Sequence, residues 1–410
     1  DYPQLRALDV FPMEKDGRQL ICLRDPQGFN EGVLLLPVPL FQLVCFFDGQ
    51  HSIRDIQAEY MRRFGELIYT EKIEEVVKEL DDHFFLEGER FSSFYNELVE
   101  KFRQEKVRRP IHAGGCYDMD PQKLRTQIES YFTCPDGPGL PIPPEKGSGS
   151  RIKGVIAPHI DLRNGGPCFA WPYKEIAQGP PPDLFIILGT AHQPMQSLFA
   201  LTHKDFETPL GTLETDRGFL KILEEKCPDN FFEDELHHRS EHTIEFQLVF
   251  LQYLYGKHPD IQIVPILCGS FHEMIAHGTP PEQVPQFRDF SAALRETLST
   301  CGKETCLIAS ADLAHVGLRY GDPSPPTPKF LEKVTQEDLE MLGWVERLDS
   351  EGFLQSIRKD GDRRRICGFP PIHFLLSVID ATYGRLLKYD RCWMDTEEQS
   401  AVTFAGMSFY

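Results

Sequence analysis

Two stretches of the chain, VIAPH at residues 155–159 and LFIILGTAH at residues 184–192, decide the fold. Each is an apolar run that ends close to a histidine, and such aliphatic and β-branched runs are typical of buried parallel strands. A third stretch of the same form, CLIASADLAH, covers residues 306–315. Open α/β sheets bind ligands just beyond the carboxyl ends of their strands. We therefore expect His159, His192 and His315 to contribute to one site.

The remainder of the chain beyond residue 110 continues this alternation of predicted strands and helices. A further buried strand is predicted at residues 261–267, and two strands at residues 385–393 and 401–409 end the chain. Alternation of this kind indicates an α/β fold with a mainly parallel central sheet flanked by helices.

The residues before this part read as a small domain of their own, residues 1–91. Two short predicted strands are followed by three predicted helices, of which residues 53–64 have Ser52 as N-cap and residues 71–83 have Thr70. A short hairpin near Gly88 would complete a winged-helix α+β plan. Residues 92–109 are predicted to form a helical connector to the third part, residues 110–410.

Composition limits the function classes. The chain has 410 residues, is 41% hydrophobic and 26% charged, and carries a formal net charge of −20. Such an acidic chain is not expected to bind nucleic acid or an anionic membrane, because both require a basic surface. The first residues contain no charged-then-apolar targeting segment, so we expect a cytoplasmic protein. The 11 cysteines are scattered without a CxxC pair, which argues against a disulfide framework.

Several polar residues could supply chemistry. Asp312 and His315 follow the third apolar run, and Cys367 stands in an RICG stretch. A helix predicted at residues 241–255, with Ser240 as N-cap, would place Glu241 and Glu245 one turn apart on the same face. Imidazole, carboxylate and thiolate together suit a borderline transition metal. Taken singly, each of these residues is more often structural, and His237 and His238 in their acidic run look like surface.

The motifs in combination resemble the Memo family, which in bacteria is protein B of the AmmeMemoRadiSam system. The match covers about residues 110–410. It rests on AGGCY (113–117), APH (157–159), LGTAH (188–192), TPLGTLETD (208–216), EHTIE (241–245), VPI (264–266), SADLAH (310–315) and ICG (366–368). The resemblance implies a fold similar to that of class III extradiol dioxygenases, which use non-haem iron(II).

The same resemblance implies roles for individual residues. The metal ligands would be His159, His192 and Cys367. Asp312 and His315 would lie beside them, with His315 as the acid/base. The pocket or the shell behind the ligands would contain His242, Glu245, Glu241 and Asp161. Asp161, Gln193 and the Leu313-Ala314 pair depart from the usual family pattern, which puts in doubt any substrate preference taken from relatives.

Residues 19–91 resemble PqqD-like domains, which recognise peptides in peptide-modification systems. The alternative is a generic helical cap or dimerisation domain. DNA binding, a common use of winged helices, is disfavoured by the acidic residues here (Glu71, Glu74, Glu75, Asp81 and Asp82).

Three functions follow from these patterns. The first is an iron(II) oxidoreductase or redox protein that works with the radical-SAM protein of the same system, although copper or zinc could compete for a thiolate-containing site. The second is a binding module whose pocket or N-terminal domain recognises a peptide or protein. The third is a zinc-dependent hydrolase that acts through metal-bound water. The chain contains no Walker loop and no dinucleotide fingerprint.

Overall fold

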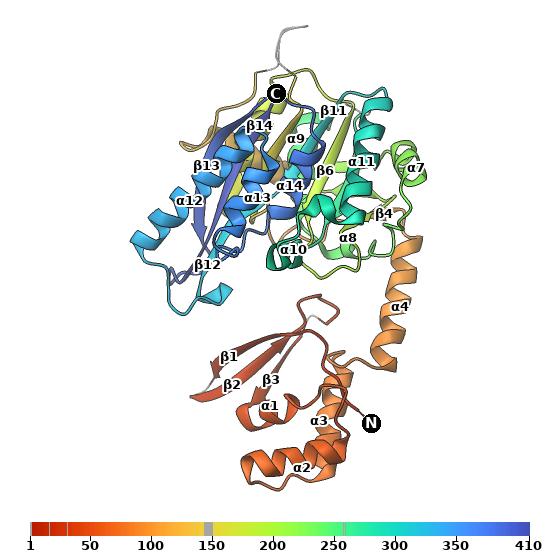
Figure 1. Cartoon of the computed structure of the whole chain (residues 1–410), viewed down its shortest axis with the longest axis vertical. Helices are drawn as coiled ribbons and strands as arrows, with labels where there is room; N and C mark the ends of the chain where they lie inside the picture. The colour runs from red at the N-terminus through yellow and green to blue at the C-terminus, as the bar shows by residue number, and fades with distance from the viewer. Residues whose placement is uncertain (1, 16, 31, 143–150, 257, 259) are drawn as a thin grey trace. The chain divides into compact units, whose positions relative to one another are not determined.

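A computed structural model describes residues 2–15, 17–30, 32–142, 151–256, 258 and 260–410 (Figure 1). The chain divides into two compact units, Asp1–Gln104 and Glu105–Tyr410. The helix expected as a connector is α4, Glu89–Gln104, and it belongs to the first unit.

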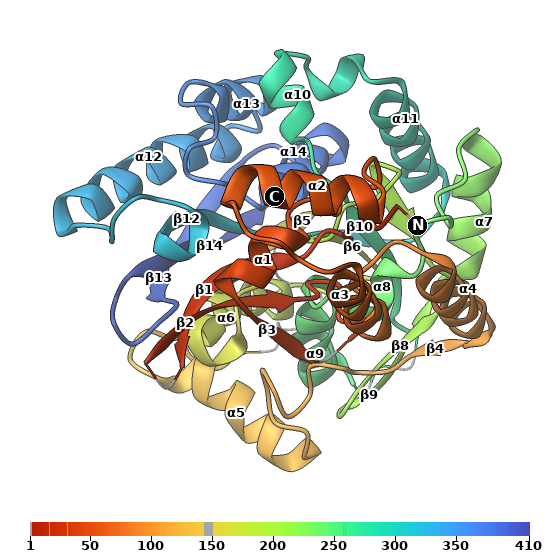
Figure 2. The ribbon, with the colours of Figure 1, turned by 90° about the horizontal axis from the view of Figure 1, so that it is seen from below.

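The larger unit is built around one sheet. Within the described residues the sheet has 11 strands, nine of them in the order β12-β14-β5-β11-β6-β10-β9-β8-β4, with β13 beside β14 and β7 beside β10. Figure 2 shows β12–β14 at one end of this sheet and β4, β8 and β9 at the other. The strands are β4 (Val107–Arg108), β5 (Gly154–Ala157), β6 (Leu184–Thr190), β7 (Phe199–Leu201), β8 (Asp205–Thr208), β9 (Gly211–Thr215), β10 (Gln262–Cys268), β11 (Thr305–Ser310), β12 (Asp312–Gly317), β13 (Gly384–Trp393) and β14 (Ser400–Phe409).

The central strands β5, β11, β6 and β10 run parallel, and β14 continues the sheet antiparallel to β5. Every residue of β6 is buried, which explains why its sequence is continuously apolar rather than alternating. The expected α/β fold with a mainly parallel central sheet flanked by helices is therefore confirmed. The expectation missed strands at the edges of the sheet. Strands β4, β8 and β9 are short, and β12 carries the polar residues Asp312 and His315.

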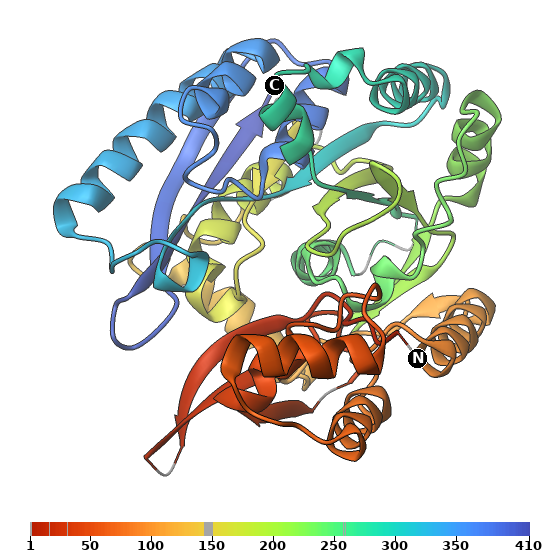
Figure 3. The same cartoon turned by 60° about the horizontal axis from the view of Figure 1, so that its bottom comes forward.

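Helices cover both faces of the sheet, as the third view shows (Figure 3). Two hydrophobic clusters, one for each face, account for the packing. One face carries α7 (Arg217–Lys226), α11 (Pro285–Thr300), α12 (Pro328–Glu346), α13 (Ser350–Arg358) and α14 (Phe369–Val378). The other face carries α5 (Pro121–Thr133), α6 (Leu162–Ala177) and α9 (Thr243–Tyr255).

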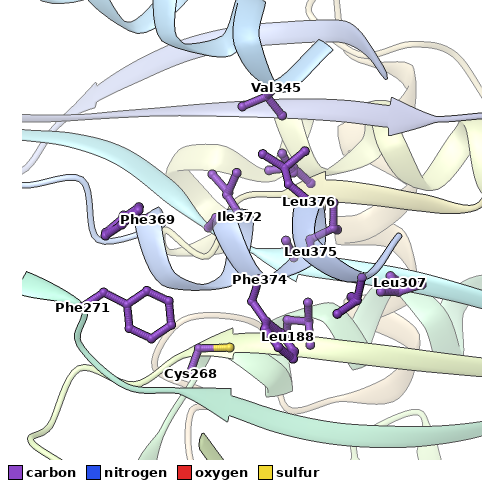
Figure 4. Packing of buried hydrophobic residues seen from close by; sticks show 14 of the residues in the cluster. Leu188, Cys268, Phe271, Leu307, Val345, Phe369, Ile372, Phe374, Leu375 and Leu376 are labelled. Atoms are coloured by element: carbon purple, nitrogen blue, oxygen red, sulfur yellow. The ribbon is translucent and has the colours of Figure 1, made fainter. Parts of the chain in front are cut away.

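Helix α14 illustrates how tightly these layers pack. Its residues Ile372, Phe374 and Leu375 are fully buried among side chains of the sheet such as Leu188 and Cys268 (Figure 4). Complete burial of one such side chain contributes about 1.5–3 kcal/mol to folding. The first turn of α14 follows directly on Cys367 and Gly368, so this packing also fixes the segment that carries the candidate thiol.

The smaller unit combines a three-stranded antiparallel sheet with helices. Its elements are β1 (Asp9–Lys15), β2 (Arg18–Arg24), β3 (Val33–Pro37), α1 (Val38–Val44), α2 (Ile53–Phe64), α3 (Thr70–Asp82) and α4. Ser52 and Asp55 form a reciprocal capping box at the start of α2, as the sequence suggested for Ser52. Thr70 was wrongly expected to cap α3, because Tyr69 precedes the helix and makes no side-chain cap.

The winged-helix plan differs from this structure in two places. A third strand, β1, pairs with β2 along its whole length. The hairpin expected near Gly88 is not formed by these described residues: Leu86 makes a single bridge to Leu5, and α4 begins at Glu89. Across the described part of both units, none of the helices has the length and apolar character needed to span a bilayer.

Candidate metal centre

Three histidines meet at the carboxyl edge of the central strands. His159 follows β5, His192 follows β6, and His242 immediately precedes α9. One ligand nitrogen from each lies within 4.8 Å of the others. The ring centroids are 5.0 Å apart for His159 and His192, 5.6 Å for His159 and His242, and 5.0 Å for His192 and His242. We call these residues the three-histidine group.

The strand ends are locked together by buried hydrogen bonds. The hydroxyl of Thr243 donates to the carbonyl of Thr190 at 3.0 Å, and that of Ser310 donates to the carbonyl of Thr243 at 2.7 Å. The amide of Gln247 donates to the carbonyl of Pro158 at 2.7 Å. A Cβ on Gly189 would lie only 2.6 Å from the Thr243 hydroxyl oxygen, so glycine is needed where α9 approaches β6. The group therefore has a rigid base.

His159 is the buried member of the group and is only 2% exposed. Its main-chain N–H donates to Oδ1 of Asp312 at 2.9 Å, and its Nδ1 lies 3.0 Å from the carbonyl oxygen of Ser310. With Nδ1 donating to that carbonyl, Nε2 keeps the lone pair that a metal requires. Burial, together with the nearby His192 and His242, lowers the pKa of His159 well below its usual value, so the imidazole is neutral.

One carboxylate, that of Glu241, holds the other two histidines. Its Oε1 lies 3.0 Å from Nδ1 of His242, and each of its oxygens lies 3.2 Å from Nδ1 of His192. It also accepts the main-chain N–H groups of His192 at 2.9 Å and His242 at 2.8 Å. Because both Nδ1 atoms face the carboxylate, the two Nε2 atoms are left for a ligand.

The charges in this contact reinforce one another. Burial alone would raise the pKa of Glu241, but His192 and His242 outweigh it and hold that pKa well below its usual value. Burial alone would lower the pKa of His192, but the Glu241 carboxylate outweighs it and raises that pKa. Glu241 is thus an anion that orients two imidazoles at once.

Cys367 lies against the same group. Its Sγ is 3.2 Å from Nε2 of His159 and 3.7 Å from the carbonyl oxygen of Asp312. Burial raises the pKa of the thiol well above its usual value, so a cation would be needed to favour the thiolate. A Cβ on Gly368 would lie 2.4 Å from the Asp312 carbonyl oxygen, so glycine allows this segment to pack against β12.

Asp312 and His315 lie beside the group; Asp312 follows β11 after one residue and begins β12, which also contains His315. Oδ2 of Asp312 is 3.7 Å from Nε2 of His159, and burial raises the pKa of Asp312 to about 7. Nδ1 of His315 lies 3.0 Å from the carbonyl oxygen of Leu313. Burial lowers the pKa of His315 to about 4, so this imidazole is neutral at physiological pH.

Glu245 does not face the histidines. Its carboxylate forms a buried ion pair with Arg108, accepts the Tyr117 hydroxyl, and accepts the main-chain N–H of His112 at 3.1 Å. The expectation that Glu241 and Glu245 share a helix face is wrong, because α9 begins at Thr243 and Glu241 precedes it. Ser240 is likewise not its cap, since it ends the short helix α8, His237–Ser240.

Two other residues have structural positions. Asp161 is the N-cap of α6, where its Oδ1 accepts the N–H of Arg163 at 2.9 Å. His238 was expected at the surface but is 1% exposed, and its Nε2 lies 3.0 Å from the carbonyl oxygen of Ala200. The acidic run before His238 concealed this burial.

The structure places His242 differently from the resemblance, which put this residue in the pocket or behind the ligands. His242 enters the group of mutually close ligand atoms, whereas Cys367 is not a member of that group and contacts His159 from the side. The ligand roles of His159, His192 and Cys367 stay predictions, and His242 joins them as a candidate. Its position at the start of α9, next to Glu241, is the signal that could have identified it.

Such donors match the preferences of a transition metal. Three imidazoles whose Nδ1 atoms contact protein acceptors, together with one adjacent thiol, are ligands that iron, copper and zinc accept. A carboxylate behind two of the imidazoles is the usual way in which proteins fix the tautomer and orientation of metal-binding histidines. The residues present therefore fit a metal ion.

Comparison with known proteins gives the family. A family model described as Memo-like protein matches residues 108–408. A MEMO1 family protein from Aquifex aeolicus is 29% identical over 411 residues, which covers 100% of both chains. A relative from Methanopyrus kandleri is 30% identical over 69% of this chain and 91% of its own, and one from Desulfurococcus amylolyticus is 31% identical over 74% and 99%. The chain belongs to the Memo family.

Proposed function

We propose that the Glu105–Tyr410 unit holds a redox-active transition metal, iron(II) in the first place, and acts as an oxidoreductase or redox protein. The observation that carries this proposal is the convergence of His159, His192 and His242 within 4.8 Å, with Cys367 in contact with His159. In each of the three imidazoles Nδ1 already contacts a protein acceptor, which is how proteins usually hold the second ring nitrogen of a metal-binding histidine.

The chain's own residues have distinct tasks in this proposal. Iron(II) in such a site would supply one-electron and oxygen chemistry. His159 and His192 would bind it, with Cys367 or His242 as the further ligand. The Glu241 carboxylate would keep His192 and His242 in one tautomer. His315 is neutral and has its Nδ1 fixed on the Leu313 carbonyl, so its Nε2 would accept or return a proton beside the metal.

Metal content after anaerobic purification tests this proposal. We expect wild type to retain stoichiometric iron, and His159→Ala and His192→Ala to lose it. Comparing Cys367→Ser with His242→Ala then shows which residue completes the ligand set. His277→Ala, at the exposed end of another helix, is the matched control. Metal content that is indifferent to all four substitutions would refute the site.

The metal itself separates the two enzyme classes. Retention of iron together with conversion of a catechol would support the oxidoreductase. Retention of zinc with no redox activity would favour the hydrolase, because zinc lowers the pKa of bound water without changing its own oxidation state. Copper(I) retained mainly through Cys367 would indicate a redox protein with a softer site.

We also propose that the smaller unit recognises a peptide or protein, in keeping with its resemblance to PqqD-like domains, and that the radical-SAM protein of the same system is a partner. The unit lies outside the residues that the Memo-like family model matches, and it has its own hydrophobic core. A separately folded addition to a shared domain is well suited to bring in a partner. Partner binding that survives both His159→Ala and Cys367→Ser would show that the partner does not recognise the metal centre.

A further inference from the structure

A small cavity opens beside the three-histidine group. It has a volume of about 190 Å³, and both His192 and Cys367 line it. Apolar side chains from Ile366 and Phe369 form part of its wall. The cavity lies where β6 and β10 end, which is the place at which α/β sheets bind small molecules.

A histidine that the metal proposal does not use also lines this cavity. His272 begins the short helix α10, His272–His277, directly after Phe271. Its Nδ1 lies 3.2 Å from Oδ2 of Asp362, and the side chain of His272 is 60% exposed whereas that of Asp362 is 2% exposed. The Asp362 carboxyl group therefore lies against Nδ1 from below the surface, so Nε2 is the ring nitrogen left for a molecule in the cavity.

The carboxylate of Asp362 also connects His272 to the segment that carries Cys367. Its Oδ1 accepts the main-chain N–H of Ile366 at 2.9 Å. Oδ2 is buried, makes no hydrogen bond of normal geometry, and lies 3.2 Å from Nδ1 of His272. The Asp362 side chain thus contacts both His272 and the segment that carries the candidate thiol.

The backbone around Asp362 is held in an unfavourable conformation. Asp362 has φ 54° and Arg365 has φ 52°, both in the left-handed region. Conformations of this kind cost on the order of 1 kcal/mol each for residues other than glycine, and they concentrate at ligand sites. Between these two residues, the guanidinium of Arg364 forms a buried ion pair with Asp338 at 2.5 Å, which holds the turn in place beside the cavity.

We propose that His272, oriented by Asp362, binds the acidic group of a small organic anion, a carboxylate or a phenolate, in this cavity. The carbon skeleton of the anion would lie on the apolar wall formed by Phe271, Ile366 and Phe369, of which Phe271 and Phe369 are visible in Figure 4. Its other end would face His192 and Cys367. That last step rests on the proposed function, because it assigns the metal to these residues.

The test is a titration with 4-fluorobenzoate, followed by fluorine NMR, on metal-free and zinc-loaded full-length protein. We expect saturable binding to wild type in both forms, with Kd raised about tenfold or more by His272→Ala, as for loss of a hydrogen bond to a charged group. Asp362→Asn keeps an acceptor for Ile366 but changes the group that lies against Nδ1 of His272, so a smaller increase is expected. His277→Ala, on the same helix but outside the cavity, should leave Kd unchanged.

Each other outcome is also decisive. Equal Kd values for wild type and His272→Ala, or no binding to wild type in either form, would overturn the inference. Loss of zinc from His272→Ala would make this residue a metal ligand and would overturn it as well. His272→Gln, which keeps a polar side chain, replaces His272→Ala if the latter fails to fold. If wild type takes up no metal but still binds 4-fluorobenzoate, and if this binding depends on His272, the proposed function is refuted and this inference is upheld.

Discussion

Glu241 and Glu245 stand four residues apart at the start of α9, yet they belong to two different regions of the molecule. Glu241 contacts two histidines whose side chains are 39% and 29% exposed. Glu245 pairs with Arg108, and the side chains of this pair are 0% and 1% exposed. The first carboxylate orients two histidines of the candidate metal centre, and the second fixes the chain behind them.

The two regions are connected through Arg108. Its guanidinium donates to the main-chain carbonyls of Glu241 at 2.9 Å and His238 at 3.0 Å, in addition to its pair with Glu245. The buried pair therefore holds the backbone from which the Glu241 side chain reaches the histidines. We infer that the Glu245 region determines stability and the Glu241 region determines ligand affinity.

Removal of Glu245 gives the largest expected effect. Glu245→Ala leaves the Arg108 guanidinium buried without its counter-charge, so we expect a loss of about 3–5 kcal/mol in the free energy of unfolding of the larger unit. Urea denaturation followed by near-UV circular dichroism measures it. The metal stoichiometry of the folded protein should persist. A loss below about 1 kcal/mol would show that water or relaxation compensates the charge, and the distinction between the regions would fail.

Neutralising Glu241 should lower metal affinity, and it should reduce stability less than removal of Glu245 does. Glu241→Gln keeps an acceptor but removes the charge that fixes His192 and His242, and changes behind a ligand typically reduce metal affinity about 10–100-fold. Competition with a chelator of known affinity measures the change, and Glu233→Gln in the nearby acidic run is the control. An unchanged affinity together with a large loss of stability would reverse the roles given to the two carboxylates.

The pH dependence of stability provides a finer distinction. Burial opposes the charge of Glu245, but Arg108 and His112 outweigh it and lower its pKa in the folded state. A carboxyl with a lowered folded pKa contributes stability above its unfolded pKa of about 4.3 and loses that contribution as the pH falls through the folded value. The stability difference between wild type and Glu245→Gln should therefore be largest near neutral pH and decrease below about pH 4. A difference that grows on acidification would contradict the ion pair.

The sequence predicted the parts of this architecture that depend on local pattern. Continuous apolar runs identified β5, β6 and β11, and the rule that parallel strands meet at their carboxyl ends placed His159 and His192 together. The motifs from Ala113 to Gly368 identified the family of the larger unit correctly. These inferences succeeded because strands that are buried on both faces of a sheet have continuously apolar sequences.

The rest depends on contacts that local pattern does not carry. The helix α9 is apolar on all sides, so its periodicity did not show that it starts at Thr243, and the orientation of Glu241 was misjudged. The Arg108 and Glu245 pair joins residues 137 positions apart, and the His272 and Asp362 pair joins the start of α10 to a distant turn. A pair of this kind is determined by tertiary packing, and the local pattern of a single sequence gives no sign of it.

The smallest predicted effect concerns Ser240, the residue that the sequence assigned as the N-cap of α9. A serine that caps a helix contributes about 0.5–2 kcal/mol. Here Ser240 ends α8, and the Glu241 carboxylate accepts the N–H groups of His242 at 2.8 Å and Thr243 at 3.3 Å, so it serves the start of α9 in place of a serine hydroxyl. Ser240→Ala should therefore change the free energy of unfolding by less than about 0.5 kcal/mol, as for substitutions away from structural features.

Urea denaturation measures this, with Ser52→Ala at the capping box of α2 as the positive control, for which a loss of about 1 kcal/mol is expected. A loss at Ser240 as large as at Ser52 would mean that α9 begins earlier, which would return Glu241 to the helix beside Glu245 and remove the structural basis for their separate roles.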